Sequence, residues 1–395
     1  MFSIKDIHDL IKACKGGIKI FGFKKRKNAA FTRDLIELKK ELIKSKTRPL
    51  PTLSIDEKVL IKKIKRKTEE LNHSNVTRTK AYFEFYKQHP EIQWAFLGHM
   101  VSRNGGWNMT DLKGDFLKGL LDKQSRQYFF SFLERGNWLI FQDAYPQFLL
   151  YEESLIRNRK LFHLLPYFNV SVFMETIWND FWKHGDKYIL TIALVINEQS
   201  YLEKRVMDNN HFKQTVFETF EYKLQELLSF NHILFPYIKN NKIKLMGQTI
   251  NQFDSLHERI MLGKRLYSLL FSNDQILKES KSWAFENSHT GSRKDYWPHL
   301  FNDVKDYAPG NFYIRRLKKC QLRKGVARIY SPRLDFAWKN VEHEPAEEGD
   351  WYDDWRVIDY LLEDTQKIDG EIVHEYCETL EKLELATIAK KAIFL

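Results

Sequence analysis

Apolar residues recur at helical spacing almost without interruption from residue 75 to about residue 300. Trp94, Leu97 and Val101, for example, fall on one face of a helix. The alternation typical of a β-strand occurs only at residues 242–250, and a single short strand has no obvious partner. Such a chain buries its apolar faces mainly by packing helix on helix. We therefore expect a mainly α fold, a multi-helix orthogonal or bundle-like globule with little or no β-structure.

Glycine and hydroxyl residues predict where some of these helices end and begin. Glycine takes positive φ without strain, so Asn104–Gly106 is expected to end the helix that contains Trp94. Thr110 is then expected to cap a new helix over residues 111–121. The sequence thus predicts a turn followed by a helix N-terminus, which is a place where backbone N–H groups attract anions.

Two further residues predict a boundary and a bend. Gly136 should close a helix over residues 124–135, and Pro146 should bend the apolar segment 138–165. Helical spacing also predicts three later helices, over residues 187–206, 211–229 and 252–271.

Charge is distributed unevenly along the chain. Residues 1–70 hold 20 Lys and Arg against 9 Asp and Glu, which accounts for the whole net charge of +11. Residues 311–333 are basic without an acidic residue, and residues 342–354 are strongly acidic. We expect three parts: a basic helical arm over 1–70, an all-α core domain over 71–340, and an acidic loop with a C-terminal helix packed on the core over 341–395.

Composition limits the class of protein. The chain is 43% hydrophobic, with 29 Phe, 18 Tyr and 10 Trp, enough for a substantial core. It has no apolar run long enough to span a bilayer, and its beginning does not resemble a cleaved signal. Cys14, Cys320 and Cys377 are far apart and odd in number, so we expect no disulfide framework and no zinc site. These features favour a reduced, cytoplasmic location.

Two polar blocks carry a resemblance to a known family. The first comprises Asn75-Val-Thr77-Arg78-Thr79, His89-Pro90-Glu91 and the stretch from His99 to Gly114; the second comprises Ser288-His289-Thr290-Gly291-Ser292-Arg293 and Asp295-Tyr296-Trp297-Pro298. Both are similar to the YppC-like family of Gram-positive bacteria, and the similarity runs from about residue 70 to 355. The resemblance implies a bacterial, cytoplasmic protein of a family with no assigned function, and it supplies no catalytic residues.

The same two blocks contain the candidate site. His99 and Arg103 share a helix face, and Arg293 lies in a polar loop that contains Gly291. Guanidinium groups and backbone donors of this kind bind phosphate or carboxylate, although core histidines and turn residues are the alternative interpretation. We predict that both segments face one polar cleft, whose candidate residues are His99, Arg103, Asn104, Asn108, Asp111, His289, Ser292 and Arg293.

Two basic clusters form a second hypothesis. Lysine and arginine clusters bind nucleic acid or anionic membrane surfaces, but solvated faces and internal ion pairs, for instance with residues 342–354, are equally ordinary roles. The candidate residues for an anionic surface are Lys24, Lys25, Arg26, Lys27, Arg315, Arg316, Lys318 and Lys319.

No motif identifies a reaction. Glu286 and His289, like Glu371 and His374, have a spacing used by metal sites, but further ligands are missing, so we expect no metal and no cofactor. The leading hypothesis is a binding protein for an anionic partner, either nucleic acid or a membrane surface that it meets from the cytoplasm. The alternative is an enzyme, a hydrolase or transferase, that acts on a phosphorylated or carboxylated substrate, with His99 or His289 transferring protons.

Overall fold

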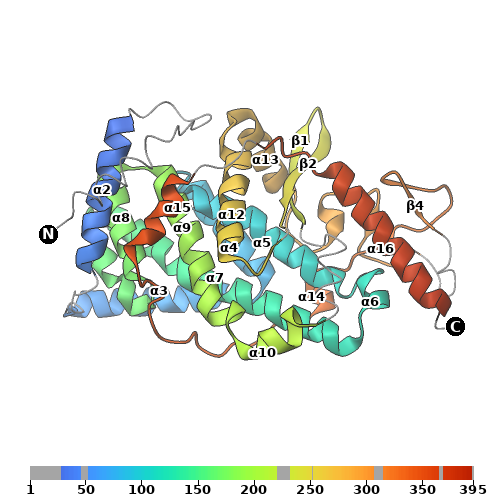
Figure 1. Cartoon of the computed structure of the whole chain (residues 1–395), viewed down its shortest axis with the longest axis horizontal. Helices are drawn as coiled ribbons and strands as arrows, with labels where there is room; N and C mark the ends of the chain where they lie inside the picture. The colour runs from blue at the N-terminus through green and yellow to red at the C-terminus, as the bar shows by residue number, and fades with distance from the viewer. Residues whose placement is uncertain are drawn as a thin grey trace.

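The computed structural model describes residues 28–45, 52–219, 232–250, 252–306, 315–363 and 368–393. These residues form a mainly helical fold with three small two-stranded sheets, so the predicted fold class is confirmed. Figure 1 shows α2 at one end of the molecule and α16 at the other. The cluster Lys24–Lys27 lies outside the described residues.

The helices differ widely in length. The α-helices are α2 (Asn28–Ser45), α3 (Ile55–Leu71), α4 (Asn75–Gln88), α5 (Gln93–Asp111), α6 (Leu117–Leu120), α7 (Lys123–Ile156), α8 (Val172–His184), α9 (Lys187–Leu202), α10 (Asn210–Phe212), α12 (Leu256–Phe271), α13 (Asp274–Glu286), α14 (Leu334–Ala337), α15 (Asp359–Leu362) and α16 (Val373–Ile393). Short 3₁₀ turns are η1 (Phe162–Phe168), η4 (Arg293–Asp295) and η5 (Trp355–Ile358), and short π turns are η2 (Glu203–Met207) and η3 (Lys213–Phe217).

Side-chain caps fix several helix starts. The hydroxyl of Ser54 accepts from the N–H of Glu57, and the Glu57 carboxylate accepts from the N–H of Ser54. This capping box satisfies two backbone donors that the first turn leaves without partners. The Ser171 hydroxyl caps α8 by accepting from the N–H of Met174, and Gly185 ends that helix at positive φ.

Helix α5 continues through the position where the sequence predicts a turn. It is one helix from Gln93 to Asp111, so the expected end at Asn104–Gly106 and the expected helix start at Asp111 are both wrong. The two glycines serve close packing instead. A Cβ on Gly106 would collide with the side chains of Asn75 and His289. The packing of Asn75 and His289 against α5 offsets the cost of about 1 kcal/mol that a glycine adds in a helix interior.

Helix α7 also joins two predicted elements. It runs unbroken for 34 residues through Gly136 and Pro146, so the boundary expected at Gly136 is wrong. The proline removes one helical hydrogen bond. Apolar side chains on both sides of it, including Phe141 and Phe148, are completely buried, and their burial offsets that loss.

One β-hairpin interrupts the helical pattern. Strand β1 (His232–Lys239) pairs antiparallel with β2 (Lys242–Thr249), so the strand expected at residues 242–250 does have a partner. Asn240 and Asn241 both have positive φ, the backbone that a two-residue hairpin turn requires. The helix predicted over 211–229 is replaced at its start by α10 and η3, and residues 220–231 are outside the described residues.

The side chain of Asn104 takes the place of a neighbouring strand beside β1. Its amide nitrogen donates to the carbonyl of Leu234 (2.9 Å), and its amide oxygen accepts from the N–H of Leu234 (2.8 Å). The amide therefore satisfies both backbone groups of a buried strand residue, as a neighbouring peptide unit would. This pair joins the hairpin to the middle of α5.

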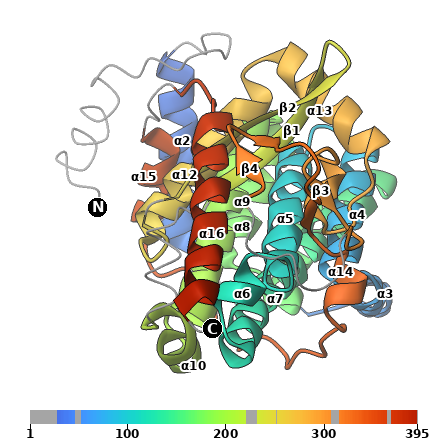
Figure 2. The same cartoon turned by 90° about the vertical axis from the view of Figure 1, so that its right-hand side faces the viewer.

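The buried apolar side chains form one cluster. Trp94 and Trp107 of α5, Trp178 of α8 and Trp283 of α13 are among its largest members, and each is at most 2% exposed. Figure 2, which views the end near α16, shows α16 in the foreground with α5 to its right. Helix α2 packs on α8, and α3 packs on α7, so both join the helical body. The domain boundaries at residues 70 and 340 stay a prediction.

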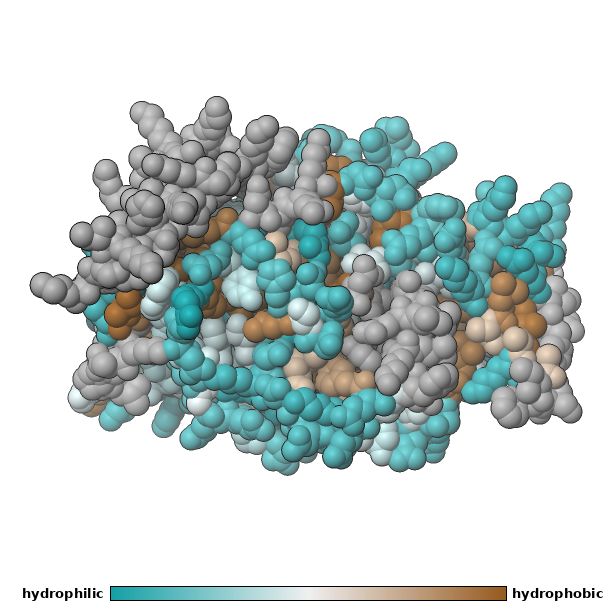
Figure 3. Space-filling model, in the orientation of Figure 1, coloured by the Kyte–Doolittle hydropathy of each residue, from teal (hydrophilic) through white to brown (hydrophobic). Residues whose placement is uncertain are grey.

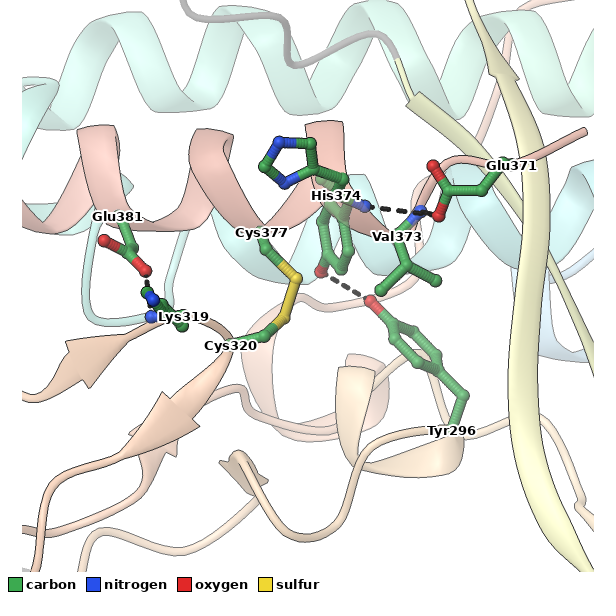
Figure 4. The surroundings of a disulfide bond; sticks show 9 residues. Tyr296, Lys319, Cys320, Glu371, Val373, His374, Cys377 and Glu381 are labelled. Atoms are coloured by element: carbon green, nitrogen blue, oxygen red, sulfur yellow. Dashed lines mark hydrogen bonds between the residues drawn. A yellow bond between two sulfur atoms is a disulfide. The ribbon is translucent and has the colours of Figure 1, made fainter.

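A disulfide connects a second small hairpin to α16. Strands β4 (Leu317–Lys318) and β5 (Gln321–Leu322) are joined by a turn in which Lys319 and Cys320 both have positive φ. Cys320 is bonded to Cys377, with their Cα atoms 5.2 Å apart (Figure 4). The Lys319 N–H also donates to Glu381, one turn further along α16 (2.5 Å). The expectation that the cysteines form no disulfide framework is wrong for this pair, because residues 57 positions apart in sequence meet in space.

The last small sheet lies beside the polar loop. Strands β3 (Phe301–Asn302) and β6 (Ile329–Tyr330) pair in parallel. No helix in the described part of the chain combines the length and apolarity needed to cross a membrane.

Candidate functional site

His99 and Arg103 are buried partners on α5. His99 Nδ1 lies 2.8 Å from the carbonyl of Thr79, and Arg103 Nε donates to His99 Nε2 at 3.0 Å. Since Nε2 accepts, Nδ1 must carry the proton and donate it to Thr79. Burial, and next the positive charge of Arg103, lower the pKa of His99. His99 is therefore neutral, with both nitrogens engaged.

The guanidinium of Arg103 reaches from α5 to the C-terminal end of α13. Its Nη2 donates to the carbonyls of Asn287 (2.5 Å) and Ala284 (3.4 Å), and its guanidinium lies 4.5 Å from the ring centroid of Trp283. A cation is favourable here because the last carbonyls of a helix are negatively polarised and lack intrahelical donors. Burial lowers the pKa of Arg103 to about 10.

Arg293 binds α5 from the polar loop. Its Nη2 donates to Asp111 at 2.6 Å, its Nε donates to both oxygens of that carboxylate at 2.9 Å, and Nη2 also reaches Asn108 at 3.2 Å. Its Nη1 donates to the hydroxyls of Tyr296 and Tyr376. Arg293 therefore joins α5, the loop and α16, and its donors are largely occupied by the protein itself.

The polar blocks around 99–111 and 288–295 thus pack directly against each other. Asp111 and Arg293 line a shared cavity of about 30 Å³, enough for roughly one water molecule. Ser292 donates its hydroxyl proton to the carbonyl of Ser331 (2.5 Å), and Asn104 binds β1 as described above. The two segments therefore lie close together, but most of the polar groups of the sequence-predicted residues are hydrogen-bonded within the protein.

A larger cavity of about 230 Å³ lies next to this cluster. It is formed by the first turn of α4, the N-terminal half of α7, the start of the 288–295 loop and the segment 333–340. Only His289 among the sequence-predicted residues lines it. The lining consists of Ser74, Asn75, Val76, Phe130, Glu134, His289, Thr290, Arg333, Leu334, Asp335, Trp338, Lys339 and Asn340.

His289 is the buried titratable group of this cavity. Its Nε2 lies 2.8 Å from Asn75 Oδ1, and its Nδ1 lies 3.6 Å from Asp295, beyond hydrogen-bond distance. The amide nitrogen of Asn75 already donates to Ser102 and Asn137, which fixes its oxygen toward His289. His289 Nε2 therefore carries a proton, and Nδ1 is left without a partner. Burial lowers the pKa of His289, although Asp295 acts in the opposite direction.

Glu134 in the cavity wall belongs to a buried ion pair. Arg78 Nη2 donates to both carboxylate oxygens of Glu134 at 2.6 Å, and both side chains are at most 5% exposed. His343 lies 3.6 Å from the same carboxylate. The charge of Glu134 is therefore compensated within the protein.

The basic stretch that follows residue 314 divides into two groups. Arg315 pairs with Glu381, and Arg316 pairs with Asp115 and Glu384. Their partners lie on α16 and after α5, so the alternative partner considered above, the acidic segment 342–354, does not supply them. That segment instead contacts α8 and α9, for example through Asp350 and the N–H of Val172, and through Trp351 and Asn197.

The second basic group has no carboxylate partner. Among the described residues, no ion pair involves Lys318, Lys319, Arg323 or Lys324, and all four side chains are exposed. On the predicted arm, by contrast, Lys63 pairs with Glu153 of α7.

Sequence reasoning missed much of the larger cavity. Lys339, Arg333 and Glu134 come from segments that the residue pattern does not connect. One signal was available: Ser74 and Thr77 have the spacing of a helix cap, and their reciprocal bonds place the first turn of α4 at the cavity.

A comparison with known families places this chain, including both of its polar blocks, in one protein family. Residues 70–375 match the family described as "Protein of unknown function (DUF2515)", and the chain is a member of that family. It is 42% identical over 237 residues to "Uncharacterized protein YppC" of Bacillus subtilis (strain 168), a match that covers 60% of this chain and 72% of that protein. No solved structure matches the chain.

Proposed function

We propose that this protein binds an anionic partner, and that the partner is a membrane surface rich in anionic lipids. The observation that carries the proposal is the group of four exposed cations on the β4–β5 hairpin, Lys318, Lys319, Arg323 and Lys324, which lack carboxylate partners among the described residues. Arg315 and Arg316 hold this hairpin on α16 through ion pairs. The cations are thus presented on a fixed support.

The neighbouring face of α16 adds apolar surface. Leu385 is 45% exposed, and Ala389 and Ala392 follow it on the same side of the helix. Figure 3 shows hydrophobic surface beside hydrophilic surface at this end of the molecule. A basic group next to an apolar helix face suits the boundary between lipid headgroups and acyl chains.

Nucleic acid is the less favoured partner. Proteins that bind single strands commonly stack bases on exposed aromatic side chains. Tyr376 is the one Phe, Tyr or Trp residue in the described parts of the β4–β5 hairpin and α16, and it is buried. Membrane binding accords with the location expected from the sequence, at the cytoplasmic periphery of the membrane.

Vesicle co-sedimentation tests the proposal. The protein should bind vesicles of phosphatidylcholine with phosphatidylserine and not vesicles of phosphatidylcholine alone. Each cation near an anionic surface contributes about 1 kcal/mol. Changing Lys318, Lys319, Arg323 and Lys324 together to Glu should therefore weaken binding by roughly a hundredfold or more.

A second variant with the same change in charge provides the control. Lys58, Lys62 and Lys65 are exposed on α3, which lies toward the other end of the molecule from α16 (Figure 1), and Lys160 is exposed just before η1, which contacts α3; changing these four residues to Glu should reduce binding much less. Equal loss in both variants would refute a local surface, and it would point to net charge alone. Binding to single-stranded RNA but not to vesicles would favour the other partner.

The enzyme hypothesis gains no support from His99. Both of its ring nitrogens are hydrogen-bonded within the protein, and it is 2% exposed. His289 is the remaining candidate for proton transfer, because it lines the larger cavity and its Nδ1 has no partner. Proton transfer by His289 stays a hypothesis.

A further inference from the structure

The cavity of about 230 Å³ is large enough for a small organic ligand. Cavities of about 150 Å³ already hold benzene, whereas a single water needs only a small fraction of this space. Phe130, Leu334 and Trp338 supply apolar wall, and the other lining side chains are mostly polar. Such a mixture of apolar wall and a few polar groups is typical of small-molecule sites.

The charges around the cavity favour an anion. Glu134 is compensated by Arg78, and Asp335 is compensated by Arg333 at 3.2 Å. Lys339 has no carboxylate partner among the described residues and is exposed at the cavity. One uncompensated positive charge therefore remains.

The first turn of α4 adds further positive potential. Ser74, Asn75 and Val76 all line the cavity, at the N-terminal end of a 14-residue helix. The Ser74 hydroxyl accepts from the N–H of Thr77, whereas the N–H groups of Asn75 and Val76 have no intrahelical acceptor at this position. Free N–H groups and the helix dipole both attract a negative group.

His289 provides an independent sign of a ligand. Its side chain is buried, it lines the cavity, and its Nδ1 has no hydrogen-bond partner. Buried polar atoms are nearly always satisfied, so an unsatisfied one at a cavity wall needs an explanation. Because Nε2 carries the proton, Nδ1 can only accept a hydrogen bond, so a ligand that satisfies it must present a donor there, such as a hydroxyl group, beside Asp295.

We propose that this cavity binds a small organic molecule through a carboxylate or phosphate group, which is held by Lys339, Arg333 and the first turn of α4. The site is separate from the membrane surface proposed above, and neither proposal depends on the other. The same anionic chemistry could come from a carboxylate or from a phosphoryl group, and the choice of probes distinguishes these two.

Calorimetric titration of the full chain tests the site, with succinate and inorganic phosphate as probes. At least one probe should bind saturably with one molecule per chain, and saturation should raise the melting temperature. Succinate alone assigns a carboxylate, and phosphate alone assigns a phosphoryl group. Because a charge-assisted hydrogen bond contributes about one factor of ten in affinity, Lys339→Ala and Arg333→Ala should each weaken binding by about tenfold.

Controls separate this site from general charge effects and from the membrane proposal. Lys324→Ala removes an exposed charge elsewhere and should leave probe affinity unchanged, whereas Lys339→Ala should still bind vesicles. The two substituted cavity residues are exposed, so both variants should fold. The proposal is overturned if neither probe binds saturably up to about 10 mM. It is also overturned if Lys339→Ala and Arg333→Ala bind the probe as tightly as the unchanged protein.

Discussion

Opening the Cys320–Cys377 disulfide should destabilise the protein by an amount that follows from the loop it closes. The bond joins residues 57 positions apart and restricts the unfolded chain more than the folded one. The chain-entropy relation for a loop of this length gives about 4 kcal/mol at room temperature. If the 395 residues unfold as one unit, the unfolding entropy is about 0.8 kcal/mol/K, and the melting temperature should fall by about 5 °C.

The assay compares unfolding of the oxidised protein, the reduced protein and Cys320→Ser by denaturant titration. Reduction changes no side chain other than the two cysteines, and Cys320→Ser should reproduce its effect. Cys14→Ser is the matched control, because Cys14 takes no part in this bond, and it should retain the response to reductant. The reasoning is refuted if oxidised and reduced protein have the same free energy of unfolding.

Further predictions concern packing, charge and redox state. Gly106→Ala should destabilise the protein by about 1–3 kcal/mol, because the new methyl group collides with Asn75 and His289. Gly136→Ala, whose methyl group meets open space within α7, should stabilise the protein by up to about 1 kcal/mol. Equal effects of the two changes in denaturant titration would contradict this account. Burial raises the pKa of Asp143 to about 7, so the folded protein keeps a proton that the unfolded chain loses near its ordinary pKa, and stability should fall as pH rises from about 4 to about 7. Relative to Asp143→Asn, the unchanged protein should lose roughly 2–3 kcal/mol between pH 5 and pH 8, and parallel stability curves would exclude this cause. Glu134→Ala should cost about 3–5 kcal/mol by leaving Arg78 as an uncompensated buried charge. The double change Arg78→Met with Glu134→Leu should cost less than the sum of Arg78→Met alone and Glu134→Leu alone. Strict additivity in this double-mutant cycle would count against the ion pair. Thiol trapping in intact cells should find Cys320 and Cys377 reduced if the protein is cytoplasmic, and a fully oxidised pair would argue against that location.

Helical periodicity was sufficient to predict the fold class because most helices have one apolar face and recognisable ends. Ser54, Ser171 and Gly185 act as their residue types predict. Local signals failed where distant contacts outweigh local preference. Gly106 lies inside a helix because Asn75 and His289 need the space that a side chain would fill.

The candidate site was predictable only in part. The sequence predicted that the two polar blocks face one cleft, whereas in the structure they contact each other directly, for example through Arg293 and Asp111. The cavity that Lys339 and His289 share was not, because segments far apart in sequence form it. Residues 320 and 377 likewise meet only after folding, so counting cysteines gave the wrong answer.

The pairing of Asn104 with Leu234 has a consequence for solubility. An exposed strand edge offers unpaired backbone groups to other chains and is a common starting point for aggregation. By occupying both groups of Leu234, the amide helps hold this side of β1 against α5, where a foreign strand cannot reach it. Replacing Asn104 with an apolar residue would therefore threaten the monodispersity of the protein as well as its stability.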